Sequence, residues 1–162
     1  MSRYSAFAGA CALAGAAALA SPASAATTTT TMAVSATVQA TCSASATPLA
    51  FGTFTGVQND AASSLSVSCT STTPYTVSLN AGTGTGATVA TRKMTSGANT
   101  LDYTLYSNAG RTTVWGQTVG TDTVAGTGSG SAQSISVYGR ITGGQLPVPA
   151  VYADTITATI TY

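Results

Sequence analysis

Two cysteines are the most informative chemical side chains of this sequence. Beyond residue 25, where we expect a signal peptide to end, only Cys42 and Cys69 remain. An even pair of cysteines in an exported chain indicates a disulfide. Closing the loop between them would stabilise the fold by about 3.6 kcal/mol through the entropy of the unfolded chain. The alternative interpretation is two separate buried thiols.

Other reactive groups are scarce. The chain contains no histidine and no glutamate, and it has four aspartates. Nucleophilic catalysis by a Ser/His or Cys/His pair is therefore excluded, and a metal site lacks the side chains to complete it. Glycoside hydrolysis would require two of the four aspartates to converge, and none lies in a distinctive motif. We expect no enzymatic activity, no catalytic or metal-binding residue and no cofactor.

The charge balance also limits the possible partners. Beyond residue 25 the chain has four basic and four acidic side chains. A net charge near zero gives no electrostatic attraction to nucleic acid or to anionic lipid. It does favour self-association.

Exposed aromatic side chains can stack on sugars, so four of them are candidates for carbohydrate binding. These are Tyr106, Trp115, Tyr138 and Tyr152. The competing interpretation, which we favour, is that most of them fill the core or flank a strand.

The first 25 residues have the pattern of a secretory signal peptide. Arg3 provides a positive start, 6–20 is apolar, and 21–25 ends in the small residues that signal peptidase accepts. We expect cleavage after Ala25. The apolar stretch is too short to span a bilayer, and no later stretch is long enough, so we expect no direct membrane insertion.

The segment that follows alternates as a strand does. From Met32 to Cys42, every second residue is apolar or small and the others are mostly polar. Period-2 alternation indicates a β-strand with one buried face. No turn signal folds this segment back into the domain, so such a strand needs a groove elsewhere. The sequence also stops on an alternating segment, Tyr152 to Tyr162.

Between these two segments the chain repeats the same strand signal. Short alternating stretches are separated by glycine, serine and threonine, and no window beyond the signal peptide has a sustained helical period. The expected strands are 49–54, 65–69, 75–79, 101–105, 114–115, 135–141 and 156–162. Strands spaced by about ten residues predict an all-β, immunoglobulin-like sandwich.

Several motifs together resemble the spore coat protein U domain family. The resemblance covers essentially all of residues 32–162 and is carried by Phe51-Gly-Thr-Phe54, Pro74 to Gly82, Arg92-Lys-Met94, Leu101 to Tyr106, Val114-Trp-Gly116, Tyr138 to Ile141, Tyr152 to Thr155 and Thr159 to Tyr162. That family includes the spore coat protein that gave the domain its name and subunits of archaic, Csu-type chaperone-usher pili. In those pilins the immunoglobulin-like sandwich lacks its final strand.

The resemblance implies a way of completing the fold. A periplasmic chaperone fills the gap first, and the N-terminal strand of the next subunit then replaces it. By this resemblance, 26–41 would be an N-terminal extension and 42–162 the pilin domain. The donor residues would be Met32, Val34, Ala36 and Val38. The edge of the acceptor groove would consist of Ile156, Ala158, Ile160 and Tyr162.

The sequence therefore predicts a pilus subunit that is exported through the periplasm and polymerises by donor-strand exchange, supporting adhesion and biofilm formation. Its partners would be a periplasmic chaperone, an outer-membrane usher, and other copies of itself or related pilus subunits. Two other interpretations stay open. One is a secreted coat protein that self-associates without a pilus, and the other is a small secreted carbohydrate-binding module.

Overall fold

A computed structural model describes residues 24–162. Residues 1–23, which hold most of the expected signal peptide, lie outside the described residues. The chain divides into two units, Met1–Ala36 and Thr37–Tyr162. All the strands of the described residues lie in the second unit. Among the described residues, no helix is long and apolar enough to cross a membrane.

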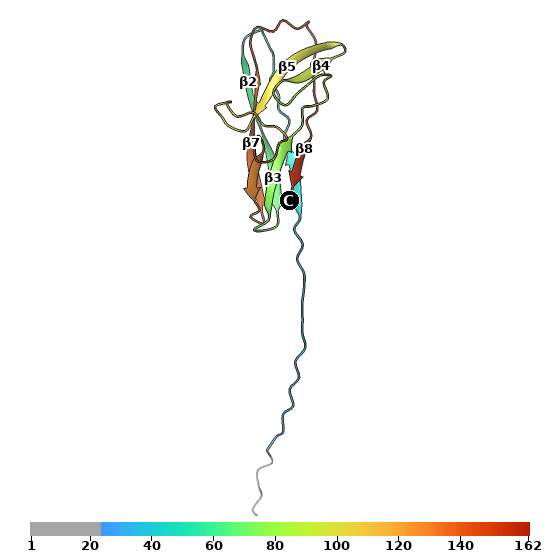
Figure 1. The fold of residues 1–162 in the computed structure, drawn as a ribbon, viewed down its shortest axis with the longest axis vertical. Helices are drawn as coiled ribbons and strands as arrows, with labels where there is room; N and C mark the ends of the chain where they lie inside the picture. Colours follow the sequence, from blue (N-terminus) through green and yellow to red (C-terminus); the bar gives the residue numbers. More distant parts are fainter. Residues whose placement is uncertain (1–23) are drawn as a thin grey trace, which may run out of the picture. The chain divides into compact units, whose positions relative to one another are not determined.

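Eight strands build the second unit, and they form two sheets (Figure 1). Five strands pair in the order β1-β2-β7-β5-β4 and three in the order β6-β3-β8. Their bounds are Cys42–Ala46 (β1), Asn59–Cys69 (β2), Pro74–Leu79 (β3), Arg92–Ser96 (β4), Asn99–Tyr106 (β5), Val124–Thr127 (β6), Ala132–Ile141 (β7) and Ala158–Thr161 (β8). Every ladder between them is antiparallel. The predicted all-β, two-sheet architecture is confirmed.

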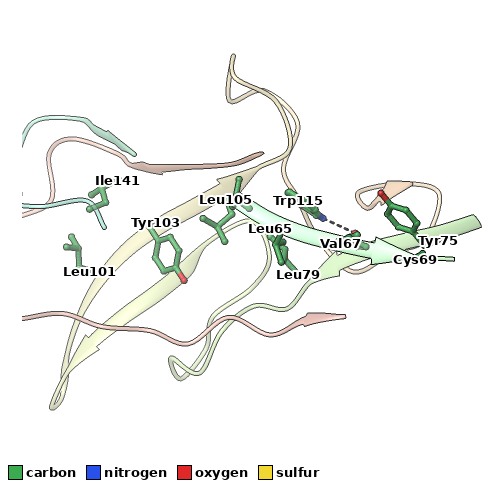
Figure 2. Close-up of a cluster of buried hydrophobic side chains, with 12 residues drawn as sticks. Leu65, Val67, Cys69, Tyr75, Leu79, Leu101, Tyr103, Leu105, Trp115 and Ile141 are labelled. Atoms are coloured by element: carbon green, nitrogen blue, oxygen red, sulfur yellow. Dashed lines mark hydrogen bonds between the residues drawn. The ribbon is translucent and has the colours of Figure 1, made fainter. Parts of the chain in front are cut away.

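The core lies between the inner faces of the two sheets (Figure 2). Strands β2, β3 and β5 each supply three buried hydrophobic residues at alternating positions, as the period-2 pattern predicts. Trp115 is fully buried, and its indole nitrogen donates a hydrogen bond of 2.9 Å to the carbonyl oxygen of Val77. That bond satisfies the one polar group of the largest core side chain.

Two predicted strands are wrong. Residues 49–54 form no strand, because Gly52 has a φ of +70° and the carbonyl oxygens of Phe51 and Thr53 accept hydrogen bonds from the Asn59 side chain instead of from a ladder. Leu49 and Phe51 lie over Gly139 of β7, where a Cβ would come within 2.7 Å of the Phe51 ring. Around Trp115 the chain makes only an isolated bridge, between Val114 and Tyr106.

The structure also contains three strands that the alternation did not predict as such, namely β1, β4 and β6. The expected strand from Met32 onward differs as well, because residues 24–41 carry no strand and the ladder begins at Cys42. A strand is defined by its hydrogen-bonded neighbour, and only Thr41 of this stretch has backbone bonds to the domain, both with Thr70.

Candidate functional site

Strand β8 is an edge strand of the three-stranded sheet. Within the described residues it pairs with β3 alone, from Ala158 opposite Leu79 to Thr161 opposite Thr76. Its other side therefore presents backbone N–H and C=O groups without a ladder partner. Such an edge is a template for pairing with a further strand.

The inner side of β8 is incompletely covered. Ile156, Ala158 and Ile160 pack against the core but stay half-buried, while the threonines between them are exposed. The neighbouring strand β3 has its inner residues exposed by 5% or less. Of the four predicted edge residues, Tyr162 alone is mostly exposed, at 58%. An apolar surface beside the free edge is thus left partly open.

Strand β1 is an edge strand of the five-stranded sheet, and its inner face is also incompletely covered. Cys42 opposes Cys69 across the ladder, and Ala44 opposes Val67 two residues on. Both Cys69 and Val67 are buried, which identifies this side of β1 as its inner side. Ala44 and Ala46 nevertheless remain exposed. The opposite sheet therefore does not cover β1.

The disulfide predicted from the two cysteines is confirmed, because Cys42 and Cys69 are bonded in the structure. It ties the first residue of β1 to the last residue of β2. The edge strand β1 is short and mostly exposed, so this covalent tie fixes it to the sheet. The chain leading into β1 consequently leaves the domain at a defined point.

The predicted donor residues lie in the first unit and at the start of the second. Met32, Val34 and Val38 are exposed by 84%, 85% and 87%, and Ala36 is also exposed. No hydrogen bond joins residues 24–40 to any other described residue. Three large apolar side chains at alternating positions are therefore without cover, which is rare in a soluble protein unless the surface has a partner.

The segment that precedes β8 is held in place by hydrogen bonds. Asp154 accepts hydrogen bonds from the Tyr103 hydroxyl and from both the backbone nitrogen and the hydroxyl of Thr83, each 2.8 Å long. Burial raises the pKa of Tyr103, and its bond to Asp154 raises it further. Asn80 accepts a hydrogen bond from the Thr157 backbone nitrogen at 2.9 Å. These hydrogen bonds thus fix the position of β8 at the edge of its sheet.

A buried arginine fixes the far end of β3. Arg92 is fully buried and donates hydrogen bonds to four backbone carbonyl oxygens, those of Leu79, Asn80, Val89 and Trp115, at 2.7–3.2 Å. Burial lowers its pKa. The guanidinium group satisfies carbonyls that no strand ladder reaches, so it has a structural role. Sequence reasoning treated Arg92 only as part of a family motif.

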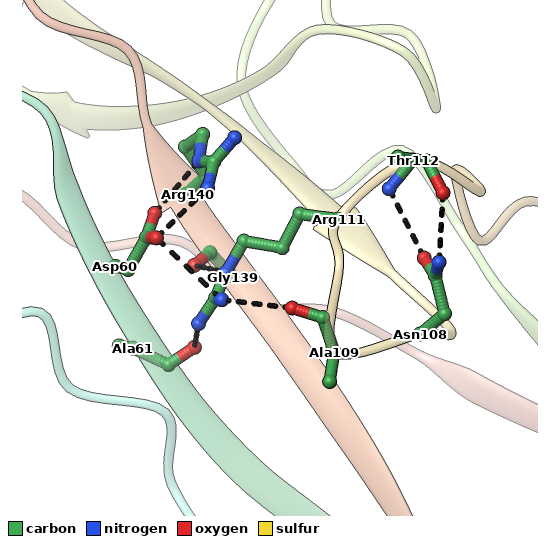
Figure 3. A network of polar contacts seen from close by, with 8 residues as sticks. All are labelled: Asp60, Ala61, Asn108, Ala109, Arg111, Thr112, Gly139 and Arg140. Carbon is green, nitrogen blue, oxygen red and sulfur yellow. Dashed lines mark hydrogen bonds and ion pairs between the residues drawn. The ribbon is translucent and has the colours of Figure 1, made fainter.

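The outer face of the five-stranded sheet carries a charge cluster (Figure 3). Arg140 binds Asp60 through two hydrogen bonds of 2.7 and 2.8 Å, and Arg111 lies 3.5 Å from the same carboxylate. The hydrogen bond from Arg140 lowers the pKa of Asp60, and the charge of Arg111 adds to this. Arg111 also donates to the carbonyl oxygens of Gly139 and Ala61. These contacts hold the loop of Arg111 against the sheet.

All four aspartates have structural partners. Asp60 and Asp154 have those described above, Asp102 pairs with Lys93 at 2.8 Å, and Asp122 accepts a hydrogen bond from the Thr118 backbone. Each of the four carboxylates is thus engaged by a basic side chain, a hydroxyl group or a backbone nitrogen. The arrangement offers packing and pairing surfaces, and its polar contacts serve the fold.

The four aromatic candidates for sugar binding are divided among three places in the domain. Trp115 belongs to the core. Tyr106 and Tyr138 are paired across β5 and β7, both half-buried, and the guanidinium of Arg111 lies 5.6 Å from the centre of the Tyr138 ring. Tyr152 donates a hydrogen bond to the carbonyl oxygen of Val148. They do not form one platform for a sugar.

Comparison with known proteins connects this architecture to a family. The Spore Coat Protein U domain matches residues 28–159. The chain belongs to that family. Protein U of Myxococcus xanthus is 36% identical over 121 residues, which cover 71% of this chain and 67% of that protein. The resemblance expected from the motifs is therefore confirmed.

Among solved structures, the fold is similar to a chain in the CsuC-CsuE chaperone-tip adhesion subunit pre-assembly complex from archaic chaperone-usher Csu pili of Acinetobacter baumannii. The TM-score is 0.60 and the sequences are 22% identical. The match covers 78% of this chain and 41% of that chain, so this protein spans less than half of the solved one. The likeness establishes the fold.

Proposed function

We propose that this protein is a structural subunit of an archaic chaperone-usher pilus and that it polymerises by donor-strand exchange. The observation that carries the proposal is a pair of complementary features in one chain. Strand β8 has a free edge above a half-buried apolar surface, and residues 32–38 expose apolar side chains with the same period. Met32, Val34, Ala36 and Val38 of one copy would cover Ile156, Ala158, Ile160 and Tyr162 of another.

Energetics support this arrangement. Burying Met32, Val34 and Val38 would contribute about 1.5–3 kcal/mol for each side chain, or roughly 5–9 kcal/mol before entropy is subtracted. The entire stability of a domain is only about 5–15 kcal/mol. A subunit without a donor strand is then marginally stable and prone to aggregate, and it requires a protective partner before assembly.

The partners follow from the same surface. A periplasmic chaperone would cover the edge of β8 until the next subunit arrives, and an outer-membrane usher would export the growing polymer. The structurally similar chain comes from a chaperone-subunit complex, which supports this expectation. The signal peptide expected at residues 1–25 would bring the subunit to the periplasm, and a pilus at the cell surface would support adhesion and biofilm formation.

A second candidate is a coat protein that self-associates through the same strand without forming a pilus. The family description, Spore Coat Protein U domain, and the 36% identity to Protein U favour it. A chaperone that co-purifies with the subunit distinguishes the two, because a pilin is expected to retain one. The carbohydrate-binding module is not proposed, since no structural observation favours it.

The test of the proposal is self-complementation. Residues 26–162 expressed alone should aggregate or be degraded. Fusion of a copy of residues 27–40 after Tyr162, through a flexible linker, should yield a soluble monomer with a cooperative melting transition. A control fusion carries Asp in place of Val34 and Val38 and should rescue nothing. An unfused protein that is already a stable monomer, and gains no stability from the fusion, would refute the proposal.

A further inference from the structure

One end of the domain exposes large apolar side chains that belong to neither the core nor the surface beside β8. We name this the apolar end, and it is formed by the loops 56–58 and 143–151. Its exposed side chains are Val57 (67%), Leu146 (93%), Val148 (50%) and Val151 (88%). The Gly144 backbone nitrogen donates a 2.8 Å hydrogen bond to the carbonyl oxygen of Gly56, so the two loops adjoin. Neither loop contains a charged residue.

The longer loop of the apolar end is held in place. The Gln145 side chain accepts a hydrogen bond from the Asp102 backbone nitrogen at 2.8 Å and donates to the Asp102 carbonyl oxygen at 2.9 Å. This pair of bonds fastens the loop to β5. Pro147 and Pro149 restrict the backbone between the exposed residues. A rigid loop loses little entropy when its side chains become buried, so the apolar end is preorganised for contact.

The apolar end and the disulfide lie at opposite ends of β2. Val57 precedes Asn59, the first residue of β2, and Cys42 is bonded to Cys69, the last. An 11-residue strand separates the two ends by about 33 Å. Beside the disulfide the surface has a shallow hollow, lined by Thr41, Cys42, Ser68, Cys69, Ser71 and Gly130 among others. We name this the disulfide end.

Donor-strand exchange would bring these two ends together. Residues 32–38 and 156–162 have the same length and the same alternation, and all ladders of the domain are antiparallel. A fully overlapping antiparallel pair places Val38 of the incoming copy beside Ile156. From Val38 to Cys42 the chain has four residue steps, which span at most about 14 Å. From Ile156 back to Val151 there are five steps, about 18 Å at most. Strand β8 is antiparallel to β3, which starts five residues after the end of β2, so β8 runs from the side of the apolar end toward the disulfide end. The incoming chain therefore leaves the groove toward the apolar end, and its short link keeps its disulfide end near there.

We propose that the apolar end of each copy is a docking surface for the disulfide end of the next copy in the polymer. This inference rests on the proposed function and names the second surface of the same joint. The exposed Leu146 and Val151 would pack on the hollow beside the Cys42–Cys69 disulfide. The contact would fix the angle between successive subunits, which are otherwise joined only through the donor strand and the short link 39–41.

Cysteine labelling tests this contact on the full chain, assembled on its own cell surface. In a Leu146→Cys variant, a fluorescent maleimide should react several-fold more slowly in the intact polymer than in subunits dissociated by heat. The matched control is Ser136→Cys, an exposed position in the middle of β7, which should react equally in both states. A bifunctional maleimide should also link Leu146→Cys to Ser71→Cys between copies, and these links should survive boiling.

The outcomes separate this inference from the proposed function. If the heat-sensitive multimers form but Leu146→Cys labels as fast as in free subunits, the docking surface is wrong and strand exchange stands. Protection of Leu146→Cys without a link to Ser71→Cys would equally overturn the disulfide end as its partner. If the unsubstituted chain forms no heat-sensitive multimers, the proposed function itself fails.

Discussion

Replacement of Val34 by aspartate should abolish the polymer while leaving the individual subunit intact. Val34 is 85% exposed and belongs to the first unit, not to the fold of residues 37–162. In the proposed joint the same side chain is buried beside Ile160 of the neighbouring copy. The substitution therefore acts on assembly, and the fold of the second unit should be unaffected.

The magnitude follows from the two environments. Loss of a buried valine forfeits about 1.5–3 kcal/mol, and a carboxylate buried without a partner costs at least a further few kcal/mol. A total of about 4 kcal/mol or more lowers the association constant by roughly a factor of a thousand, because each 1.4 kcal/mol is tenfold. No polymer should survive such a loss at ordinary concentrations.

The assay compares Val34→Asp with Ser35→Asp, which places the same charge one residue away on the outward side of the strand. Surface extracts are run on gels without boiling, and the ladder of heat-sensitive multimers is quantified. Val34→Asp should show no ladder and Ser35→Asp a nearly normal one. Each variant subunit should still bind chaperone or a wild-type donor strand. Equal ladders for the two variants would show that this strand does not join one subunit to the next.

Three further predictions concern the fold and are measured by urea or thermal unfolding of the self-complemented subunit. Replacing Cys42 and Cys69 together by serine should lower the free energy of unfolding by about 3–4 kcal/mol, through the longer open loop of the unfolded chain; a loss below 1 kcal/mol would contradict this. Arg92→Met should lower the free energy of unfolding by about 3 kcal/mol or more, because it leaves four carbonyl oxygens without their donor. Arg92→Lys should not restore this stability, since an ammonium group cannot reach all four oxygens. Full stability of the lysine variant would refute this account. The lowered pKa of Asp60 means that the folded state favours its ionised form. The ion pair therefore stabilises the fold above the ordinary aspartate pKa of 3.8, and this stabilisation is lost as the pH falls below that value. Its size is about 1 kcal/mol or less, because the pair is partly exposed. Asp60→Asn should remove that part of the pH dependence, and an unchanged profile would contradict the assignment.

Alternation predicted the strands or parts of strands whose inner residues are all apolar, such as β3, the second half of β2 and the buried part of β5, because one buried face imposes period 2. The alternation pattern failed where contacts other than a strand ladder determine the backbone conformation. The stretch 49–54 alternates without being a strand, since Phe51 packs over Gly139 instead of joining a ladder. Strand β4 places Arg92 inward, opposite Tyr103, which is acceptable only because four carbonyls surround the guanidinium. Strand β6 places Gly126 against the Tyr75 ring, so no side chain there signals burial.

Part of the candidate site could likewise be predicted from alternation in the sequence. The alternation of apolar residues in 32–38 and in 156–162 is evident in the sequence, and so is the cysteine pair. The open inner side of β1 was not, because Ala44 and Ala46 continue the same alternation and give no sign of where the free segment ends and the ladder begins. That boundary lies at Cys42 because the disulfide holds it there.

A remaining question is why the chain would not fill its own site. To do so, residues 32–38 would have to reverse through 39–41, a three-residue loop without glycine, proline, asparagine or aspartate. Thr41 is already engaged, since it bonds through its nitrogen and its oxygen to Thr70. The reversed strand would be antiparallel to β1 and would therefore run in the same direction as β2. Strand β8 also runs in that direction, because it is antiparallel to β3, which turns back directly after β2. The reversed strand would thus be parallel to β8. A strand from another copy has none of these restrictions and can pair antiparallel, as every other strand of the domain does. Under the proposed function, the short link before Cys42, which lacks turn-forming residues, therefore disfavours self-completion and favours exchange between copies.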